Sequence, residues 1–553
     1  MTKPLRIYIL NLNRYVEVAG GTTLQEIAES VASELPFRPI CARVNNKTEA
    51  LAFALYAPKD VEFLDRTNDS GRRTYVRSLC MMLYSAATSL YPGSRLRLEH
   101  SVSRGYFCRI IGPARVDAKA LEERMRAICL ADIPFCRHEG RTEEVINLFE
   151  RQGLVDKVLL LKTVHQPYTV YYTLGDLADS YYGCLAPSTG HINVFALDHY
   201  EDGLLLRGFD SEDPATPPVP VPQAKMFKAF TDHLLFNQII GVSNVGQLND
   251  AVDHRRTADL VNVAEALHEK NIAAIADQIT ERYHRGGARI VLVAGPSSSG
   301  KTTTTKRLAI QLMTHLLRPH MISLDDYFVN RELTPRDESG DYDFESLYAL
   351  DLTQFNTDLE AILDGREVKL PTYSFELGKR IYKDKRIKLN DGDILLIEGI
   401  HGLNPELTAA IADDQKFRVY VSALTTLAID DHNWVPTTDN RLLRRIIRDH
   451  KYRGTSALET LRRWPSVRRG EERWIFPYQE NADATFNSSL IFELGVMRDY
   501  ADDILQGVHA DSPEYATAYR LRKFLSYFRP IPMETIPPTS LLREFLGGSS
   551  FHY

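Results

Sequence analysis

The sequence predicts an α/β protein whose C-terminal half contains a parallel sheet flanked by helices, preceded by two α+β regions. After residue 285, apolar strands alternate with helical stretches, which is the pattern of a sheet covered on both faces. Before residue 210, short strands outnumber the helical stretches. Between the two patterns, residues 210–223 hold five prolines and no helical periodicity, so we expect a linker or surface loop there.

The composition is that of an ordinary globular protein, with 553 residues, 44% hydrophobic and 25% charged. It excludes wholesale disorder, a collagen-like repeat and a small disulfide scaffold, and the length suits roughly three or four domains. No apolar stretch approaches the ~20 residues that cross a bilayer, and polar residues follow the start too soon for a signal peptide. Six cysteines without a Cys-x-x-Cys pair indicate a reduced, cytoplasmic protein with no membrane partner.

The first half contains the elements of two small units. Residues 4–65 hold one helix, 23–35, which Thr22 or Thr23 would cap, and short strands at 6–10, 15–18, 41–45 and 61–65. The next region, residues 70–209, combines helices at 75–90 and 118–129 with strands at 157–164 and 192–197.

The second half begins with a helix at 261–283 that ends at Gly286 and Gly287. Strands then follow at 289–295, 320–326, 393–399 and 416–423, with helices at 302–317 and 441–451. We therefore divide the chain into two N-terminal α+β domains, a helical connector and a last domain, with bounds 1–66, 67–223, 224–284 and 285–553.

The most specific motif is the phosphate-binding loop GPSSSGKT, which fits G-x-x-x-x-G-K-[ST] and stands between an apolar strand and a helix. Its glycines let backbone N–H groups and the helix N-terminus point at phosphates. Lys301 reaches the β- and γ-phosphates, and the Thr302 hydroxyl ligates Mg²⁺. We expect a nucleoside triphosphate to bind the loop and the first helical turn, namely Gly295, Ser297, Ser298, Ser299, Gly300, Lys301, Thr302 and Thr303.

Two acidic strand ends and an arginine-rich segment accompany this loop. Asp325 and Glu398 follow apolar strands, where strand C-termini line an α/β site. Residues 441–473 hold ten Arg and one Lys against four acids, a local charge of +7 in a chain whose net charge is −7. One helical face carries Arg441, Arg444, Arg445 and Arg448, and such a face is suited to clamp a transferring phosphoryl group.

Over roughly 285–500 the chain resembles the uridine kinase/phosphoribulokinase family of P-loop kinases. The matching segments are GPSSSGKT, SLDDYF, DYDFES, LPTYSF, IEGI and RRIIRD…RG. The resemblance implies ATP and Mg²⁺ as cofactors, with Thr302, Asp325 and Glu398 around the metal. It also implies Asp325 as the base for the accepting hydroxyl, with Lys301, Arg448 and Arg453 as its catalytic partners. Arg444, Arg448 and Arg453 would form a lid over the triphosphate.

The same resemblance implies an acceptor pocket and a nucleoside acceptor. Asp343 would bind the ribose hydroxyls, Tyr373 would pack near the base, and Arg380 is a further substrate-binding candidate. Uridine kinases usually carry a histidine five residues after that tyrosine, whereas this chain has Gly378. We expect phosphoryl transfer to the 5′-hydroxyl of a nucleoside, uridine or cytidine first.

Two alternatives stay open. One is an RNA-associated regulatory protein in which nucleotide binding gates an RNA surface, and the other is a phosphoribulokinase-like sugar kinase. A regulatory protein would not need an acid at Asp325 to activate a hydroxyl or an acid at Asp343 to bind ribose. A sugar kinase would share the catalytic residues of a nucleoside kinase and differ from it only in the acceptor pocket.

The N-terminal half resembles two domains of threonyl-tRNA synthetases. Residues 4–65 are similar to the ubiquitin-like TGS domain, and residues 70–209 are similar to the second additional domain, through YVRSLCMMLYSAATSLYPGSRLRLEHSVSRGYFCRI and GCLAPSTGHINVFAL. That domain edits mischarged amino acid with His and Cys ligands, but Arg77, Met81 and Ser188 stand at three of the four positions here. We therefore expect no intact zinc site and a buried apolar role for Cys184. Three roles stay open for this half: binding RNA, binding a regulator, or packing against the kinase. An oligomer of the whole chain also stays open.

Overall fold

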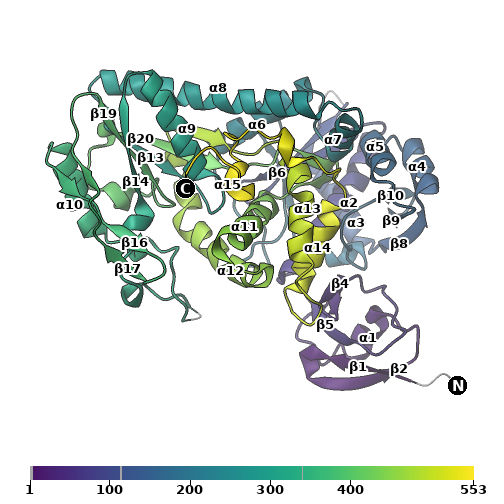
Figure 1. The fold of residues 1–553 in the computed structure, drawn as a ribbon. Helices are drawn as coiled ribbons and strands as arrows, with labels where there is room; N and C mark the ends of the chain where they lie inside the picture. Colours follow the sequence, from purple (N-terminus) through teal and green to yellow (C-terminus); the bar gives the residue numbers. More distant parts are fainter. Residues whose placement is uncertain (1–3, 113–114, 339, 553) are drawn as a thin grey trace.

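The computed structural model describes residues 4–112, 115–338 and 340–552. In Figure 1 the parallel sheet of the C-terminal half lies at the left and the sheets of the N-terminal half at the right, with the first small sheet projecting below. The predicted fold class is confirmed: a helix-flanked parallel sheet follows two α+β regions. Within the described residues, no helix combines the length and apolar character that crossing a membrane requires.

The first sheet has the strand order β2-β1-β5-β3-β4 and packs against helix α1. Its elements are β1 (Leu5–Ile9), η1 (Leu10–Leu12), β2 (Arg14–Val18), α1 (Leu24–Ser30), β3 (Cys41–Val44), β4 (Lys47–Glu49) and β5 (Asp60–Leu64). Thr23 caps α1 as predicted, since its side chain accepts from the Glu26 N–H while the Glu26 carboxylate accepts from the Thr23 N–H. The helix ends at Ser30, five residues earlier than predicted.

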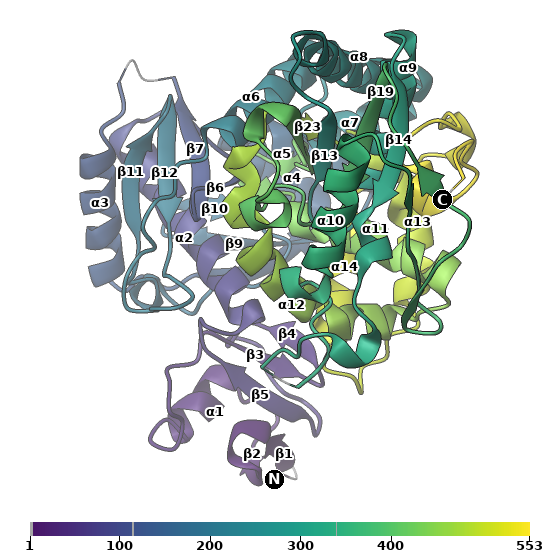
Figure 2. The same cartoon turned by 90° about the vertical axis from the view of Figure 1, so that its left-hand side faces the viewer.

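The second region has two antiparallel sheets, with orders β11-β12-β7-β6 and β10-β9-β8. Figure 2 shows α3 beside the first of these sheets. The elements are α2 (Asp69–Leu90), β6 (Arg95–Val102), β7 (Gly105–Ile111), α3 (Ala118–Leu130), β8 (Cys136–Arg141), α4 (Thr142–Arg151), α5 (Val155–Val164), β9 (Tyr168–Leu174), β10 (Leu177–Asp179), η2 (Thr189–His191), β11 (Ala196–Tyr200) and β12 (Gly203–Arg207).

Two predicted strands of this region were wrong. Residues 157–164 form most of helix α5, because this short apolar run lies between two cores: Val158 and Leu161 face one and Leu160 faces the other. The strand predicted at 192–197 begins only at Ala196, because the 3-10 turn η2 precedes it and Ile192 packs into the core below.

Residues 210–223 contain no helix or strand, as predicted, and three connector helices follow them. They are α6 (Ala224–Ile239), α7 (Val245–Asp253) and α8 (Thr257–His284). In Figure 1, α8 runs across the top from α7 to α9. Apolar residues of α7 and α8 belong to the same core as the parallel sheet, so the connector packs as part of the C-terminal half.

The parallel sheet has the order β14-β19-β13-β20-β23, with every neighbouring pair parallel. Its strands are β13 (Ile290–Ala294), β14 (Arg318–Ser323), β19 (Asp393–Glu398), β20 (Lys416–Ser422) and β23 (Ala484–Asn487). The first strand, β13, therefore lies at the centre and leads into α9 (Lys301–Thr314). Its carboxyl end is the switch point at which open α/β sheets bind ligands.

The remaining helices are α10 (Leu352–Leu363), α11 (Thr437–Arg453), α12 (Ala457–Trp474), α13 (Glu493–Leu505), α14 (Tyr515–Leu525) and α15 (Arg543–Leu546). Short strands pair as β15 (Val368–Lys369) with β18 (Arg386–Ile387), β16 (Thr372–Ser374) with β17 (Lys379–Ile381), and β21 (Ala428–Asp430) with β22 (Asn433–Trp434). Single 3-10 turns are η3 (Leu324–Tyr327), η4 (Arg331–Leu333), η5 (Leu347–Ala349), η6 (Pro405–Thr408), η7 (Asp413–Gln415), η8 (Phe476–Asn481) and η9 (Met533–Thr535).

A buried ionic network joins the two halves of the molecule. The Lys157 ammonium on α5 contacts Asp179 and Asp430, each at 2.8 Å, and the His432 ring contacts Asp179 at 2.8 Å. All four side chains are at most 2% exposed. Because Asp430 and His432 belong to the β21–β22 hairpin, that hairpin is fixed to the N-terminal half.

Candidate active site

The phosphate-binding loop leaves β13 and enters α9 in a conformation that depends on its glycines. A Cβ atom at Gly295 would lie 2.0 Å from the carbonyl oxygen of Val421 on β20, so the neighbouring strand leaves room for glycine alone. Gly300 has a φ of +85° at the start of α9, and Ser298 has a φ of +58°. The loop therefore curls around the N-terminus of α9, as an anion cradle does.

Arginines of α11 form the floor of this loop. Arg441 Nε donates to the carbonyl of Ser297 at 2.9 Å, and an N–H of Arg445 donates to the hydroxyl of Ser297, also at 2.9 Å. Arg441 is 1% exposed and pairs with Glu471, whose Oε1 also accepts from the Ser297 N–H at 3.1 Å. A neutralised ion pair thus fixes the loop backbone from below.

Arg444, expected to contact the triphosphate, is fully buried under the same loop. Its guanidinium pairs with Glu493 at 2.6 Å and donates to Ser488 and to the Ser298 carbonyl. The structure thus places it behind the loop, where its charge is already balanced.

Two strand-end acids meet at the open side of the loop. Ser323 and Glu398 are partners in the β14–β19 ladder, so Asp325, two residues later, reaches the same edge of the sheet as Glu398. Burial raises the pKa of Glu398 to about 7, and the Asp325 charge adds to this, while Lys301 and the Thr302 hydroxyl act in the opposite direction. Thr302, Asp325 and Glu398, the three expected metal-site residues, are therefore neighbours.

Asp325 also lies within the field of the basic residues assigned to catalysis. Desolvation raises the pKa of the Asp325 carboxyl, although part of the side chain is exposed to solvent. The positive charges of Lys301, Arg453 and Arg448, in that order, lower the same pKa. The structure thus brings the four expected catalytic side chains close together, in a group that is called the recess below.

The other two expected lid arginines, Arg448 and Arg453, are held by one acid of their own helix. Arg448 donates to Asp449 Oδ1 at 2.8 and 3.0 Å, and Arg453 lies 3.5 Å from the same oxygen. Arg453, at the end of α11, has a side chain 57% exposed, whereas Arg448 is 18% exposed. Gly454 follows in the left-handed region and ends the helix.

Glu345 belongs to this recess and was missed by the sequence analysis. Burial raises its pKa to about 7, Glu471 and Asp325 raise it further, and Arg445 and Lys301 lower it. Its Oε2 is buried without a hydrogen-bond partner in the described structure. The sequence signal was present in the DYDFES segment, where only Asp343 had been selected.

The expected acceptor residues lie beside the recess. Asp343 Oδ1 accepts from the Glu345 N–H at 3.1 Å, so Asp343 orients the turn that carries Glu345. Tyr373 on β16 is buried, and its N–H donates to Asp326 Oδ1 at 3.3 Å. Arg380 on β17 pairs with Asp351 at 2.8 Å.

Gly378, at the position where the resemblance implied a histidine, occupies a tight turn. Its φ is +65°, and a Cβ there would lie 2.9 Å from Nε of Arg331. Arg331 donates to the Gly378 carbonyl through its backbone N–H at 2.8 Å and to the Phe375 carbonyl through its side chain at 2.5 Å. The Arg331 guanidinium therefore fills the space in front of Gly378.

Comparison with known proteins agrees with this geometry. Residues 290–490 match the phosphoribulokinase / uridine kinase family. This segment is a P-loop kinase domain of that family. A uridine kinase of Staphylococcus aureus (strain JH9) is 27% identical over 195 residues, which are 35% of this chain and 84% of that protein.

Solved structures similar to the kinase domain include a putative fructose transport system kinase from Silicibacter sp. TM1040, with 20% identity and a TM-score of 0.29 over 39% of this chain and 98% of the other. A possible uridine kinase from Bacillus stearothermophilus has 19% identity and a TM-score of 0.26 over the same shares.

The N-terminal third is similar to threonine–tRNA ligases, as the sequence analysis inferred. The ligase of Desulforamulus reducens is 29% identical over 187 residues, which are 33% of this chain and 29% of the ligase. That of Rubrobacter xylanophilus is 28% identical over 185 residues. The chain thus spans less than a third of the length of these ligases.

Arg77, which stands at a position where the resemblance to the synthetase domain implied a histidine ligand, is largely buried. Its guanidinium donates to the Cys184 carbonyl at 2.9 and 3.0 Å and to the Thr74 hydroxyl at 3.2 Å, and Met81 is a core residue. Cys184 was expected to be a buried apolar residue, but its side chain is only half-buried. Its surroundings are also polar, because its Sγ lies 3.3 Å from Thr74 Oγ1. A hydrogen bond from the Cys41 thiol and the charge of Arg77 lower the pKa of Cys184 to about 6.

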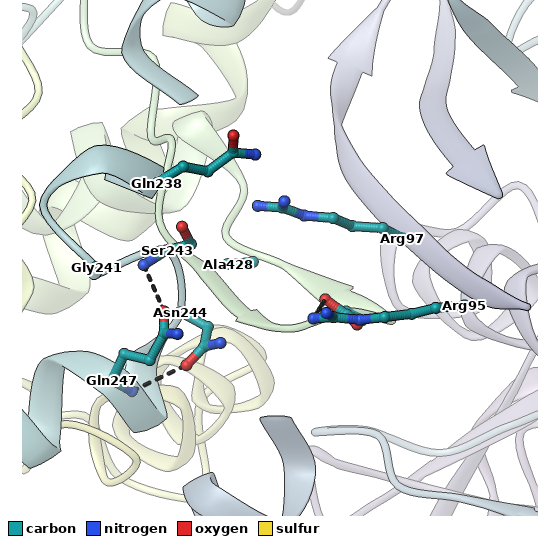
Figure 3. A pocket seen from close by; sticks show the side chains of 9 residues that line it. Arg95, Arg97, Gln238, Gly241, Ser243, Asn244, Gln247 and Ala428 are labelled. Atoms are coloured by element: carbon teal, nitrogen blue, oxygen red, sulfur yellow. Dashed lines mark hydrogen bonds and ion pairs between the residues drawn. The ribbon is translucent and has the colours of Figure 1, made fainter. Parts of the chain in front are cut away.

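A cavity of about 230 Å³ lies away from the kinase recess, where β6, the α6–α7 turn and the β21–β22 hairpin meet. Figure 3 shows Arg95 and Arg97 extending from β6 toward this turn. Arg95 pairs with Asp431 of the hairpin, and Gln247 closes the turn by accepting from the Ser243 N–H at 2.7 Å. The cavity thus marks the joint between the N-terminal half and the kinase domain.

Proposed function

We propose that the chain is an ATP-dependent kinase that transfers the γ-phosphoryl group to the 5′-hydroxyl of a nucleoside, with uridine and cytidine as its first acceptors. The observation that supports this most is the position of Asp325 in the field of Lys301, Arg448 and Arg453. The lysine of a phosphate-binding loop contacts the γ-phosphate, so Lys301 indicates where that phosphate would lie. A carboxylate in the same recess is suited to receive a proton, which a purely nucleotide-binding switch does not require.

In the proposed mechanism, Asp325 accepts the proton of the attacking hydroxyl as the new O–P bond forms and the bond between the γ-phosphorus and the β–γ bridging oxygen breaks, which releases ADP. Its raised pKa makes it a better base than an ordinary carboxylate. Lys301, Arg448 and Arg453 balance the negative charge of the transferring group. The exposed position of Arg453 allows it to close over the nucleotide and exclude water.

The residues around Thr302 fit a magnesium ion. The Thr302 hydroxyl adjoins the Glu398 carboxylate, and the Asp325 carboxylate is close enough to raise the pKa of Glu398. Oxygen ligands of this kind are those that Mg²⁺ prefers, and the unpartnered Oε2 of Glu345 adds another near Lys301. When bound, Mg²⁺ would neutralise charge on the β- and γ-phosphates.

A cluster of aromatic side chains around Phe328, three residues after Asp325, supports a planar acceptor. The ring of Phe328 lies 5.5 Å from Tyr373, 6.1 Å from Phe375 and 6.2 Å from Phe344. Phe344 and Phe375 are 38% and 59% exposed, although large aromatic surfaces are usually covered. A stacked nucleobase would cover them, and a sugar phosphate would not.

A phosphorylation assay with Mg-ATP tests this function against the sugar-kinase alternative. The panel contains uridine, cytidine, purine nucleosides and sugar phosphates, and the products are identified by mass. We expect a pyrimidine nucleoside 5′-monophosphate as the main product. Phosphorylation of a sugar phosphate alone would refute the nucleoside assignment, and ATP hydrolysis without any phosphorylated acceptor would refute the kinase.

A further inference from the structure

A strap formed by residues 540–546, which includes α15, packs against the start of the phosphate-binding helix. Leu541 and Phe545 are fully buried. A Cβ on Gly300 would lie 2.6 Å from the Leu541 side chain, and the Phe545 ring lies 5.2 Å from the Arg444 guanidinium. The strap backbone is thus a fixed part of the core around the loop.

One side chain of the strap contacts the anion-binding end of α9. The Glu544 carboxylate, through Oε2, accepts from the Thr303 N–H at 3.1 Å and from the Thr303 hydroxyl at 2.7 Å. Thr303 is in the first turn of α9, whose N–H groups have no partner within the helix and carry the positive end of its dipole. Glu544 is therefore an intramolecular anion at a phosphate-binding helix terminus.

A nucleotide would need the same donors. In a phosphate-binding loop, the backbone N–H groups at the helix start cradle the α- and β-phosphates. One oxygen already occupies both the N–H and the hydroxyl of Thr303. A phosphate oxygen taking that place would also meet the charge of Glu544, so the two anions exclude each other.

The charge around the loop adds to this competition. Glu544 and Asp325 are both close enough to Glu398 to raise its pKa, so three carboxylates lie near the phosphate-binding loop. The arginines beneath the loop do not offset them, because Arg441 pairs with Glu471 and Arg444 with Glu493.

We propose that Glu544 is a built-in competitor for the nucleotide, which occupies a phosphate position at Thr303 in the nucleotide-free protein and must rotate away when a nucleoside triphosphate binds. The side chain is only partly buried, so it can move while Leu541 and Phe545 keep the strap in place. Glu544 would thus set the nucleotide affinity. This inference rests on the proposed nucleotide binding and concerns a residue 241 positions beyond Thr303.

Calorimetric titration of the full chain with ATP, without acceptor, tests the proposal. Glu544→Gln removes the charge, and Glu544→Ala removes the carboxylate. We expect both to bind ATP at least about tenfold more tightly than wild type, because less repulsion has to be overcome. Glu534→Gln removes a charge from an exposed site in η9, six residues before the strap, and serves as the matched control, with affinity unchanged.

Inorganic tripolyphosphate is the second ligand, because it presents three phosphates without a nucleoside. It should show the same gain in the Glu544 variants, which a general loosening of the strap would not produce. Thermal unfolding of the nucleotide-free protein is measured in parallel, and Glu544→Ala should lower the Tm there but not at saturating ATP.

Three results would count against the inference. Unchanged ATP affinity in Glu544→Gln would show that the carboxylate does not compete, and weaker binding would show that it assists the nucleotide. If neither wild type nor the variants bind ATP, the proposed function itself fails, and the inference with it.

Discussion

At the residue scale, the chemistry of the recess depends on carboxylates that are close to one another and poorly hydrated. Burial raises the pKa values of Glu398 and Glu345 to about 7, and it also raises that of Asp325. Lys301 lowers all three pKa values and so acts as a common counter-charge. The recess is therefore suited to bind cations and to accept a proton. Without a bound cation, ionised carboxylates there repel one another.

The cost of ionising Glu398 in this place predicts a pH-dependent effect of Glu398→Gln. Folding raises the pKa of Glu398 from 4.5 to about 7, so the folded protein holds this proton more tightly than the unfolded chain does. This contribution to the free energy of unfolding is complete below about pH 4.5 and is lost as the pH rises through 7. The variant lacks this loss. Between pH 5 and pH 8 its free energy of unfolding should therefore gain about 1–3 kcal/mol relative to wild type, measured by urea unfolding without Mg²⁺ or nucleotide.

The matched control is Glu376→Gln in an exposed loop, whose difference from wild type should not change over this pH range. A Glu398→Gln difference that is flat or declines with pH would show that this carboxylate is not held against its ionisation.

At the element scale, α11 has a different role from the one that its arginine pattern indicated. The spacing correctly placed Arg441, Arg444, Arg445 and Arg448 on one helix, and we expected that face to meet the phosphates. Arg441 and Arg444 instead turn toward Glu471 and Glu493, which lie 30 and 49 residues further along the chain. A pattern within one helix cannot reveal such distant partners, whereas Arg453 at its end is exposed, and its role in a lid stays a prediction.

Removing one partner of the pair beneath the loop should be costly. In Glu471→Gln the buried Arg441 loses its counter-charge, so we expect the free energy of unfolding to fall by about 3 kcal/mol. The neighbouring Glu472→Gln removes a largely exposed partner of Arg468 and should cost less than about 1 kcal/mol. Chemical denaturation measures both, and equal losses would contradict the assigned role of Glu471.

Local sequence patterns correctly predicted elements that have a clear cap or a glycine motif. They gave wrong predictions where tertiary packing determines the secondary structure. The Thr23 cap and the G-x-x-x-x-G-K-[ST] loop are local chemistry and were predicted correctly. Residues 157–164 became a helix because both of its faces are buried, which no periodicity within eight residues discloses. Glu345 and Glu544 were missed because only folding brings them to Lys301 and Thr303.

At the scale of the whole molecule, the two halves share one buried ion network. Lys157 of the synthetase-like region holds Asp430 of the kinase half, and the β21–β22 hairpin leads directly into α11 under the phosphate loop. We infer that the N-terminal half supports the position of the kinase helix.

Lys157→Met should therefore destabilise the entire chain. Two buried carboxylates, Asp179 and Asp430, lose their shared cation, which should cost about 3–5 kcal/mol and lower the Tm of the kinase half together with the N-terminal half. Lys162→Met, on the same helix but with an exposed partner, should cost less than about 1 kcal/mol. Separate transitions, with only the N-terminal one shifted, would contradict this coupling.

The most direct measurement of the central claim is kcat of Asp325→Asn with Mg-ATP and the preferred nucleoside, together with the Kd for ATP. We predict that kcat falls ~100-fold or more while the Kd stays within about threefold, because the variant loses a positioned base and keeps the phosphate cradle. Asp364→Asn, which alters an exposed acid directly after the last residue of α10, should keep the wild-type kcat. A wild-type kcat in Asp325→Asn would remove this aspartate from the mechanism.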